Sequence, residues 1–261
     1  MLDSLIRARD KFLKPKTGLM FPSHTTMYLA PIFDEEERRL SHKDYNNAMG
    51  DWHEFVDSTQ SLYGVNMKIL EKDFEKEQRD YYLLSSRWAE LNPNALLAEP
   101  VAIKELDMMT CTLHDARGIF AGDKNSSFEF DIVGDEVIQQ NSQTVISGFA
   151  LWFTADFKSR TDEDGFLAPE IINPSYLSTG PENGYTHWGQ QVFHFISCIP
   201  LIKGEITKMT GTIEMVRTTQ NSRLYNCRLK YDSARRKRDE GTNSSSAIMK
   251  TPLVDLIYKI P

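Results

Sequence analysis

The chain of 261 residues has a net charge of −7, from 30 Lys and Arg against 37 Asp and Glu, and 40% of its residues are hydrophobic. This composition is typical of a globular protein with a core of its own, and its acidic balance argues against general nucleic-acid binding, which needs a basic face. No apolar run approaches the roughly 20 residues that cross a bilayer. We therefore expect neither a nucleic acid nor a membrane among the direct partners.

The excess of negative charge is confined to one segment. Residues 33–100 hold 15 acidic and eight basic residues, whereas the remainder holds 22 of each. The three cysteines, Cys111, Cys198 and Cys227, are widely spaced and form no CxxC pair. They indicate neither a disulfide framework nor a metal site, so we expect a reducing compartment, cytoplasmic or nuclear or both.

The first 17 residues predict a short linker helix that ends at the sequence KPKTG. Its apolar stripe consists of Leu2, Leu5, Ile6, Phe12 and Leu13. No capping residue precedes the helix. Residues 18–33 then favour extended structure, with alternating apolar side chains at Met27 and Leu29.

Residues 34–98 change to a helical pattern. The first stretch carries an aromatic stripe at intervals of four, three and three, formed by Tyr45, Met49, Trp52 and Phe55. A second stretch, from about Glu71 to Leu91, presents Phe74, Tyr81, Leu84 and Trp88 before the sequence NPN breaks it. These stripes either pack on the core of the chain itself or form the docking face of an arm.

From residue 99 to 261 the apolar period falls to two. The segments SFEFDI, VISGFALWFTADF, LYNCRLKY and LVDLIYKI alternate apolar with polar side chains. Many short strands with turns between them, and with no intervening helices, predict an antiparallel barrel or sandwich, so the fold class is mainly β. Residues 234–246 are charged and rich in serine, which predicts a mobile loop within this region.

A motif search leaves one cluster for chemistry. The sequence contains no GxGxxG, GxxxxGK[ST], HExxH or GxSxG motif. Of the six histidines, His194 alternates with apolar residues along a strand and is expected to be structural. His187 lies between Thr186 and Trp188 after a turn at Pro181–Gly184, at a loop tip where an imidazole can pair with a carboxylate and an indole can stack on a flat cation.

Four segments together resemble one known family. In order, MLDSLIRARDKFLKPKTGLMFPSHTTMYLAPI, GFALWFTADF, LSTGPENGYTHWGQQVF and KGEITKMTGTIEM are similar to the C-terminal part of the protein arginine N-methyltransferases. The triplet THW after LSTGP is among the most specific signatures of that family. The sequences of the segments EPVAIKELDM and GFALWFTADF are most similar to those of the type I members, which make asymmetric dimethylarginine.

The resemblance implies a fold and partners. In the family a β-barrel follows a cofactor domain, and a helical dimerisation arm inserted after the first barrel strand docks on the cofactor domain of the other subunit. Residues 34–98 would be that arm, and Tyr45, Met49, Trp52 and Phe55 its docking face. The implied partners are a second subunit, identical or different, and arginine-containing protein substrates such as histones or RNA-binding proteins.

The resemblance also implies a site. Thr186, His187 and Trp188 would form the loop that closes one side of the target-arginine pocket. His187 would act in catalysis by pairing with a carboxylate near the active site, and Thr186, Trp188 and Tyr185 would contact the substrate. The residue after THW is usually basic in the family, whereas Gly189 stands here.

The chain departs from the family in what it lacks. The sequence has neither the glycine-rich motif that binds S-adenosylmethionine nor the loop with two glutamates that holds the guanidinium, and it begins where the cofactor domain would end. We therefore expect this chain to bind no cofactor and to be inactive alone, with S-adenosyl-L-methionine used by the intact enzyme. Two other interpretations stay open: a non-catalytic partner of a methyltransferase, and a β-barrel interaction module.

Overall fold

The computed structural model describes residues 2–15, 17–141, 144–159, 175–221, 223–237 and 249–261. The helices are α1 (Leu2–Phe12), α2 (Glu35–Tyr63), α3 (Glu71–Tyr82) and α4 (Gly134–Asn141). The strands are β1 (His24–Ile32), β2 (Arg87–Ala89), β3 (Val101–Asp107), β4 (Gly118–Ile119), β5 (Ser127–Val133), β6 (Val145–Phe157), β7 (Ser175–Ser178), β8 (Gln190–Pro200), β9 (Glu205–Arg217), β10 (Tyr225–Lys237), β11 (Met249–Lys250) and β12 (Val254–Ile260).

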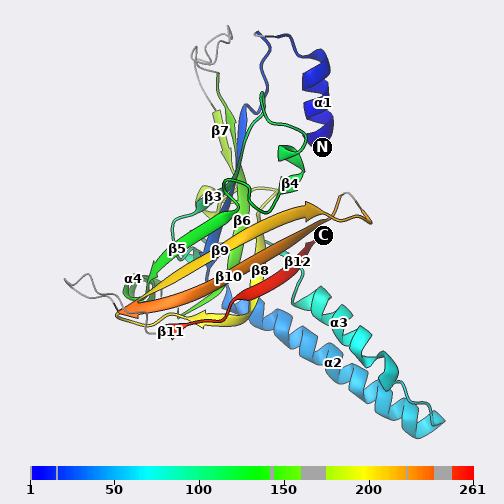
Figure 1. The fold of residues 1–261 in the computed structure, drawn as a ribbon. Coiled ribbons are helices and arrows are strands. Elements are labelled where there is room, and N and C mark those ends of the chain that lie inside the picture. The colour runs from blue at the N-terminus through cyan, green and yellow to red at the C-terminus, as the bar shows by residue number, and fades with distance from the viewer. Residues whose placement is uncertain (1, 16, 142–143, 160–174, 222, 238–248) are drawn as a thin grey trace.

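The strands form two sheets in which every pair of named strands within the described ranges is antiparallel. The first sheet has the order β2-β8-β6-β1-β3, with β7 paired to β6. The second has the order β11-β10-β9-β4, with β12 paired to β10 and β5 to β9. The two sheets enclose one apolar interior (Figure 1). The predicted mainly β, barrel-like fold with an inserted helical arm is confirmed.

The core follows the period-two pattern of the sequence. Phe128, Phe130 and Ile132 of β5 are buried, while the residues between them are exposed. Around Phe149 of β6, aromatic rings from both sheets meet edge-to-face or tilted, at centroid distances of 5.1–6.1 Å. Strand β6 is buried on both sides, because Ala150 and Trp152 pack in a second apolar cluster on its other face. The segment that leaves the arm covers that second face.

Helix α1 packs at one end of the barrel. Ile6 is fully buried, and Asp3 accepts hydrogen bonds from Arg117 at 2.9 Å and from Arg217 at 2.9 Å. The predicted stripe is wrong at Phe12, which is 73% exposed, whereas the neighbouring Leu13 packs against the apolar cluster around Ile6.

Helices α2 and α3 form an arm that projects from the barrel (Figure 1). Helix α2 has 29 residues and is therefore about 43 Å long at roughly 1.5 Å per residue. Gly64 ends it in the left-handed conformation, at φ 69°, where glycine carries no steric penalty. The second predicted helix is too long, because α3 stops at Tyr82 and Trp88 lies in strand β2, which pairs with β8.

The arm has an apolar seam between its helices. Trp52 of α2 stacks on Phe74 of α3, with ring centroids 4.4 Å apart, and Val56 is buried beside them. Tyr45 also faces α3, since burial and the nearby carboxylate of Glu75 raise the pKa of its hydroxyl. Part of the predicted docking stripe is therefore covered by the second helix of the arm and does not face a partner. Five of the exposed large apolar side chains of the described residues lie at the arm tip: Leu62, Tyr63, Val65, Ile69 and Leu70.

Two further expectations need correction. The barrel region contains a helix, α4, so it is not free of intervening helices. The predicted loop at residues 234–246 begins too early, because β10 continues through Lys237 and residues 234–237 pair with β9. Residues 238–246 lie outside the described residues. Within the described ranges, no helix is both long and apolar enough to cross a bilayer.

Candidate functional site

The candidate site is the loop Tyr185–Trp188, which enters strand β8. Before it, Thr179 anchors the chain to β6, because its hydroxyl accepts a hydrogen bond from the Phe153 amide at 3.1 Å and donates to the Phe153 carbonyl at 3.0 Å. A short 3₁₀ helix, η5 (Pro181–Asn183), then reverses the chain. The rigid sheet therefore fixes one end of a loop that is itself exposed, an arrangement common in binding sites.

The structure brings the predicted site residues together at one edge of the first sheet. Tyr185, His187 and Trp188 are exposed and Thr186 is half-buried. Trp188 is 52% exposed, and its indole contacts the Phe153 ring edge-to-face with centroids 5.8 Å apart. The centroid of the His187 ring lies 6.1 Å from that of the Trp188 indole. In the described part of the chain the His187 imidazole has no hydrogen-bond or ion-pair partner.

The loop closes as a tight turn. The Gly189 amide donates to the carbonyl of Thr186 at 3.2 Å and to its hydroxyl at 3.3 Å. The loop presents an imidazole, an indole, a phenol and a hydroxyl, but it carries no carboxylate.

Two residues that support the loop were not predicted from the sequence. The Trp88 indole N–H donates to the Trp188 carbonyl at 2.8 Å. The side chain of Gln190, which is only 2% exposed, donates from Nε2 to the Thr179 carbonyl at 2.7 Å and accepts the Leu91 amide at 2.8 Å on Oε1. The one sequence signal for Gln190 was its place next to the THW triplet, whereas Trp88 had been assigned to a helix.

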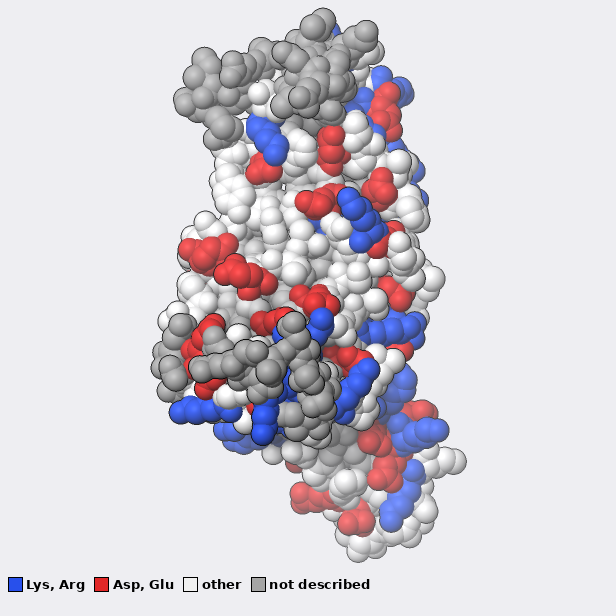
Figure 2. All heavy atoms as spheres, turned by 60° about the vertical axis from the view of Figure 1, so that its left-hand side comes forward, with Lys and Arg blue, Asp and Glu red and all other residues white. Residues whose placement is uncertain are grey.

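A groove near the loop is lined by both acidic and apolar residues. It has a volume of about 920 Å³, and its carboxylates come from Glu99, Glu129, Asp131, Glu136 and Glu182. Glu182 belongs to η5, directly before the loop. Two of the acids are partly neutralised, since Glu129 pairs with Lys208 at 2.6 Å and Asp131 with Arg236 at 3.5 Å. Figure 2 faces this side of the molecule and shows acidic side chains on a mostly uncharged middle surface, with basic ones below.

The root of α2 is fixed to the barrel by polar groups. His194, expected to be structural, lies in β8 and pairs through Nε2 with the Asp34 carboxylate at 2.9 Å. One turn on, Arg38 donates to Glu35 at 2.8 Å, and this hydrogen bond outweighs burial and holds the pKa of Glu35 at about 2. Burial, aided by the Glu35 carboxylate, raises the pKa of Cys198 to about 12, so its thiol donates to Glu35 instead of ionising.

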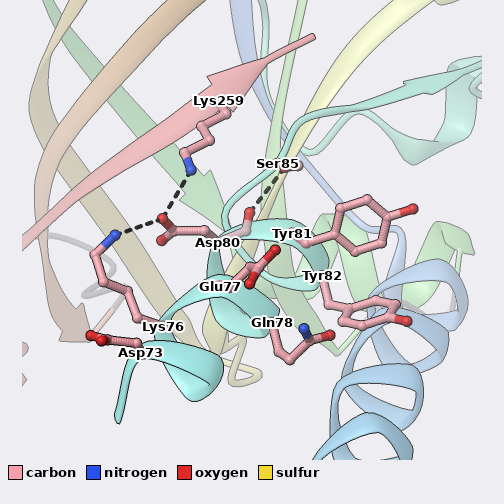
Figure 3. A pocket seen from close by; sticks show the side chains of 9 residues that line it. All are labelled: Asp73, Lys76, Glu77, Gln78, Asp80, Tyr81, Tyr82, Ser85 and Lys259. Carbon is pink, nitrogen blue, oxygen red and sulfur yellow. Dashed lines mark hydrogen bonds and ion pairs between the residues drawn. The ribbon is translucent and has the colours of Figure 1, made fainter. Parts of the chain in front are cut away.

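The far end of α3 is held by the last strand. Figure 3 shows Asp80 between Lys76 of its own helix, at 3.1 Å, and Lys259 of β12, at 2.9 Å. Burial raises the pKa of Asp80, but the hydrogen bonds from Lys259 and Lys76 outweigh it, and the pKa lies below its usual value. The main chain adds two bonds, from the Lys259 amide to the Leu84 carbonyl and from the Ser86 amide to the Lys259 carbonyl. Both ends of the arm are therefore fixed to β-structure.

The described ranges contain no group of three or more His, Cys, Asp or Glu side chains arranged to hold a metal ion. The three cysteines are free thiols, and Cys111 and Cys227 are buried. Burial raises the pKa of both thiols, which makes them poor nucleophiles. The polar chemistry that faces solvent near the barrel edge is therefore that of the Tyr185–Trp188 loop and the acidic groove.

Comparisons with known proteins agree with this arrangement. Residues 23–236 match the family model of the arginine methyltransferase oligomerization subdomain. Protein arginine N-methyltransferase PRMT10 of rice (Oryza sativa subsp. japonica) is 37% identical over 234 residues, which cover 89% of this chain and 56% of the relative. PRMT10 of Arabidopsis thaliana is 36% identical over 235 residues, with 88% and 56% covered. The chain thus spans a little over half the length of these relatives.

The fold is shared with solved structures. The crystal structure of Arabidopsis thaliana protein arginine methyltransferase 10, described as a uniquely open conformation, superimposes with a TM-score of 0.78 at 31% identity, covering 99% of this chain and 65% of that chain. The Trypanosoma brucei PRMT1 enzyme–prozyme heterotetrameric complex with AdoHcy has a TM-score of 0.58 at 16% identity, covering 100% and 63%, and that likeness concerns the fold alone. Because the family model matches most of its residues, the chain belongs to the protein arginine methyltransferase family, in which it corresponds to the oligomerization subdomain.

Proposed function

We propose that this chain is the substrate-binding and dimerisation part of a type I-like protein arginine N-methyltransferase, which transfers a methyl group from S-adenosylmethionine to arginine side chains of proteins. The observation that carries the proposal is the Thr186–Trp188 loop, whose main chain is held by hydrogen bonds while His187 is exposed and the Trp188 indole, which packs on Phe153, stays 52% exposed. Such a loop is suited to meet a second surface.

The side chains of the loop determine which parts of the methyl-transfer reaction this chain can contribute. Methyl transfer needs the sulfonium methyl in line with the guanidinium nitrogen, and carboxylates that hold the planar cation through paired hydrogen bonds. An imidazole and an indole supply neither. We therefore propose that Tyr185 and Trp188 wall the target-arginine pocket, that Thr186 shapes the turn, and that His187 pairs with a carboxylate outside these 261 residues. On this account the chain alone binds no S-adenosylmethionine and is not catalytic.

The acidic groove supports a basic protein as the substrate. Five carboxylates, two of them paired with basic side chains, line it together with apolar residues, so it favours a peptide whose arginines lie near small or apolar residues. Because Glu182 stands directly before the loop, a peptide in this groove would extend toward His187 and Trp188.

The arm supports dimerisation. Its tip exposes contiguous apolar side chains, with Ile69 exposed to 86%, and exposed apolar patches of this kind mark protein interfaces. We propose that the tip, together with Phe55, docks on a second subunit, either another copy or a related chain. The predicted stripe would contribute indirectly, because Trp52 holds α2 against α3.

Reconstitution tests the proposed function. The chain is mixed with S-adenosylmethionine and an arginine-containing peptide, alone or with the part of the rice relative that this chain does not match, supplied as a separate polypeptide. Mass spectrometry should detect methylated peptide only when both polypeptides are present. Methylation by the chain alone would contradict the proposal. Stimulation of an intact relative, without any transfer in the two-part mixture, would indicate the alternative of a non-catalytic partner subunit.

A further inference from the structure

Strand β2 connects the arm to the candidate site. It begins five residues after α3 ends and pairs with β8 directly behind the loop, with Trp88 opposite Gln191 and Ala89 opposite Gln190. From this position the Trp88 indole reaches back along β8 and donates its N–H to the Trp188 carbonyl. The segment that leaves the arm therefore touches the main chain of the loop.

Gly189 shows how closely the indole is fitted. Its φ of +53° lies in the region that disfavours side chains, and a Cβ atom built there would lie 2.5 Å from Trp88 Nε1 and 2.6 Å from the Ala89 carbonyl oxygen. Only glycine meets both conditions at once. Trp88 thus occupies the space that any side chain after the THW triplet would need.

Gln190 supplies a second connection between the same two segments. Its amide accepts the Leu91 N–H from the arm-exit segment and donates to Thr179, before the loop. Next to it, the Ser86 hydroxyl donates to Gln191 Oε1 at 2.9 Å. Side-chain hydrogen bonds therefore link residues 86–91 to three positions around the start of β8: Trp188, Gln190 and Gln191.

The exposure of Trp88 indicates that its hydrogen bond orients the loop more than it stabilises the folded chain. Its indole is 51% exposed, and a hydrogen bond at such a position contributes little to the free energy of folding because water competes for the donor. The same bond still fixes the direction of one carbonyl, and with it the peptide plane between Trp188 and Gly189.

We infer that Trp88 is a positioning residue for the target-arginine pocket, acting through the Trp188 carbonyl and the Gly189 backbone. The inference rests on the proposed function of the loop. Because Trp88 follows the arm in the chain, any displacement of the arm-exit segment is transmitted to the loop through this contact.

The structural half of the inference is tested on the chain by amide hydrogen exchange of residues 185–190. Trp88→Phe keeps an aromatic ring but removes the indole donor, and we expect roughly fivefold faster exchange in this segment, with a larger effect for Trp88→Ala. Exchange in β9 and the circular dichroism spectrum should not change, which confirms that the barrel is folded. Unchanged exchange at residues 185–190 in both variants would overturn the inference.

Two matched controls distinguish loss of the contact between Trp88 and the loop from a general disturbance of β2 or of the loop backbone. Arg87→Ala alters the neighbouring residue of β2, whose guanidinium lies over the Tyr81 ring of the arm at 5.8 Å, and should leave exchange in the loop unchanged. Gly184→Ala changes another glycine with positive φ, but in open space, whereas Gly189→Ala meets the Trp88 indole. Gly189→Ala should therefore loosen residues 185–190 more than Gly184→Ala does. Equal effects would contradict the inference.

The functional half uses the reconstituted mixture. Trp88→Phe should lower kcat for peptide methylation by about tenfold, as expected for a displaced pocket wall, while the KM for S-adenosylmethionine stays constant. If transfer is unchanged in Trp88→Phe and Trp88→Ala but lost in His187→Ala, the pocket is real and the inference is wrong. If His187→Ala and Trp188→Ala also leave transfer unchanged, the proposed function itself has failed, and the role of Trp88 in the pocket falls with it.

Discussion

Replacing Gln190 by leucine removes a buried amide that joins three segments. Leucine has a similar volume, so the main loss is of hydrogen bonds. The Thr179 carbonyl loses its donor at 2.7 Å and the Leu91 amide loses its acceptor at 2.8 Å. An unpaired buried polar group costs about 1–3 kcal/mol. Thr179 is fully buried, whereas Leu91 is half-buried and water can satisfy its amide in part. We therefore expect the free energy of unfolding to fall by about 2–3 kcal/mol.

Urea denaturation at neutral pH, followed by circular dichroism, measures this loss. The midpoint should fall without a change in the slope, as for a variant that alters only native-state stability. Gln191→Leu is the matched control, because among the described residues its side chain makes one hydrogen bond, from the buried Ser86 hydroxyl, and it should cost about half as much, roughly 1–1.5 kcal/mol. A loss below about 0.5 kcal/mol for Gln190→Leu, or an equal loss in both variants, would refute the reasoning.

Three further predictions concern the arm. Ile69→Asp should abolish association of the chain with the part of the rice relative that it does not match, measured by sedimentation velocity of the mixture, because it places a charge in the exposed apolar tip. Lys72→Asp on α3 should not, and association that survives Ile69→Asp would exclude the tip as the interface. Trp52→Ala should weaken the pairing of α2 with α3 by about 2 kcal/mol, half the usual loss for a buried tryptophan. The weakening should appear as loss of the helical circular dichroism signal at temperatures below the unfolding of the barrel. An unchanged helical signal would contradict the packing of Trp52 between the two helices. Glu35 has a folded pKa of about 2 against an ordinary 4.5, so its stabilisation is present above pH 4.5 and is lost as the pH falls toward 2. The stability difference between the wild type and Glu35→Gln should shrink over that range, and a difference independent of pH would exclude the ion pair with Arg38.

The sequence predicted those parts of the fold that depend on local periodicity. The alternation in residues 127–133 and 225–231 matches the buried faces of β5 and β10, because one face of each strand packs in the barrel. The end of α3 was not predictable in this way. Residues 83–91 keep a helical spacing of large side chains, and only their pairing with β8, about 100 residues away, converts the segment to strand β2.

The candidate site shows the same division. The THW triplet and the preceding turn were visible in the sequence, and the structure places those residues at one exposed edge. The supports of the loop were not visible, because Trp88 and Gln190 act through contacts between distant segments that leave no periodic signal. The arm was predicted as a helical segment, but its stripe includes Trp52, which packs on Phe74. Periodicity identifies an apolar face without identifying what covers it.

The central claim is that His187 and Trp188 complete an active site whose carboxylates and cofactor come from outside these 261 residues. Its most direct test is the single-turnover rate of methyl transfer to an arginine-containing peptide by the chain mixed with the part of the rice relative that this chain does not match. We expect transfer by the wild-type chain, and a rate lower by about 100-fold with His187→Ala, as expected for loss of a group that orients a catalytic carboxylate. An undiminished rate with His187→Ala would contradict the claim.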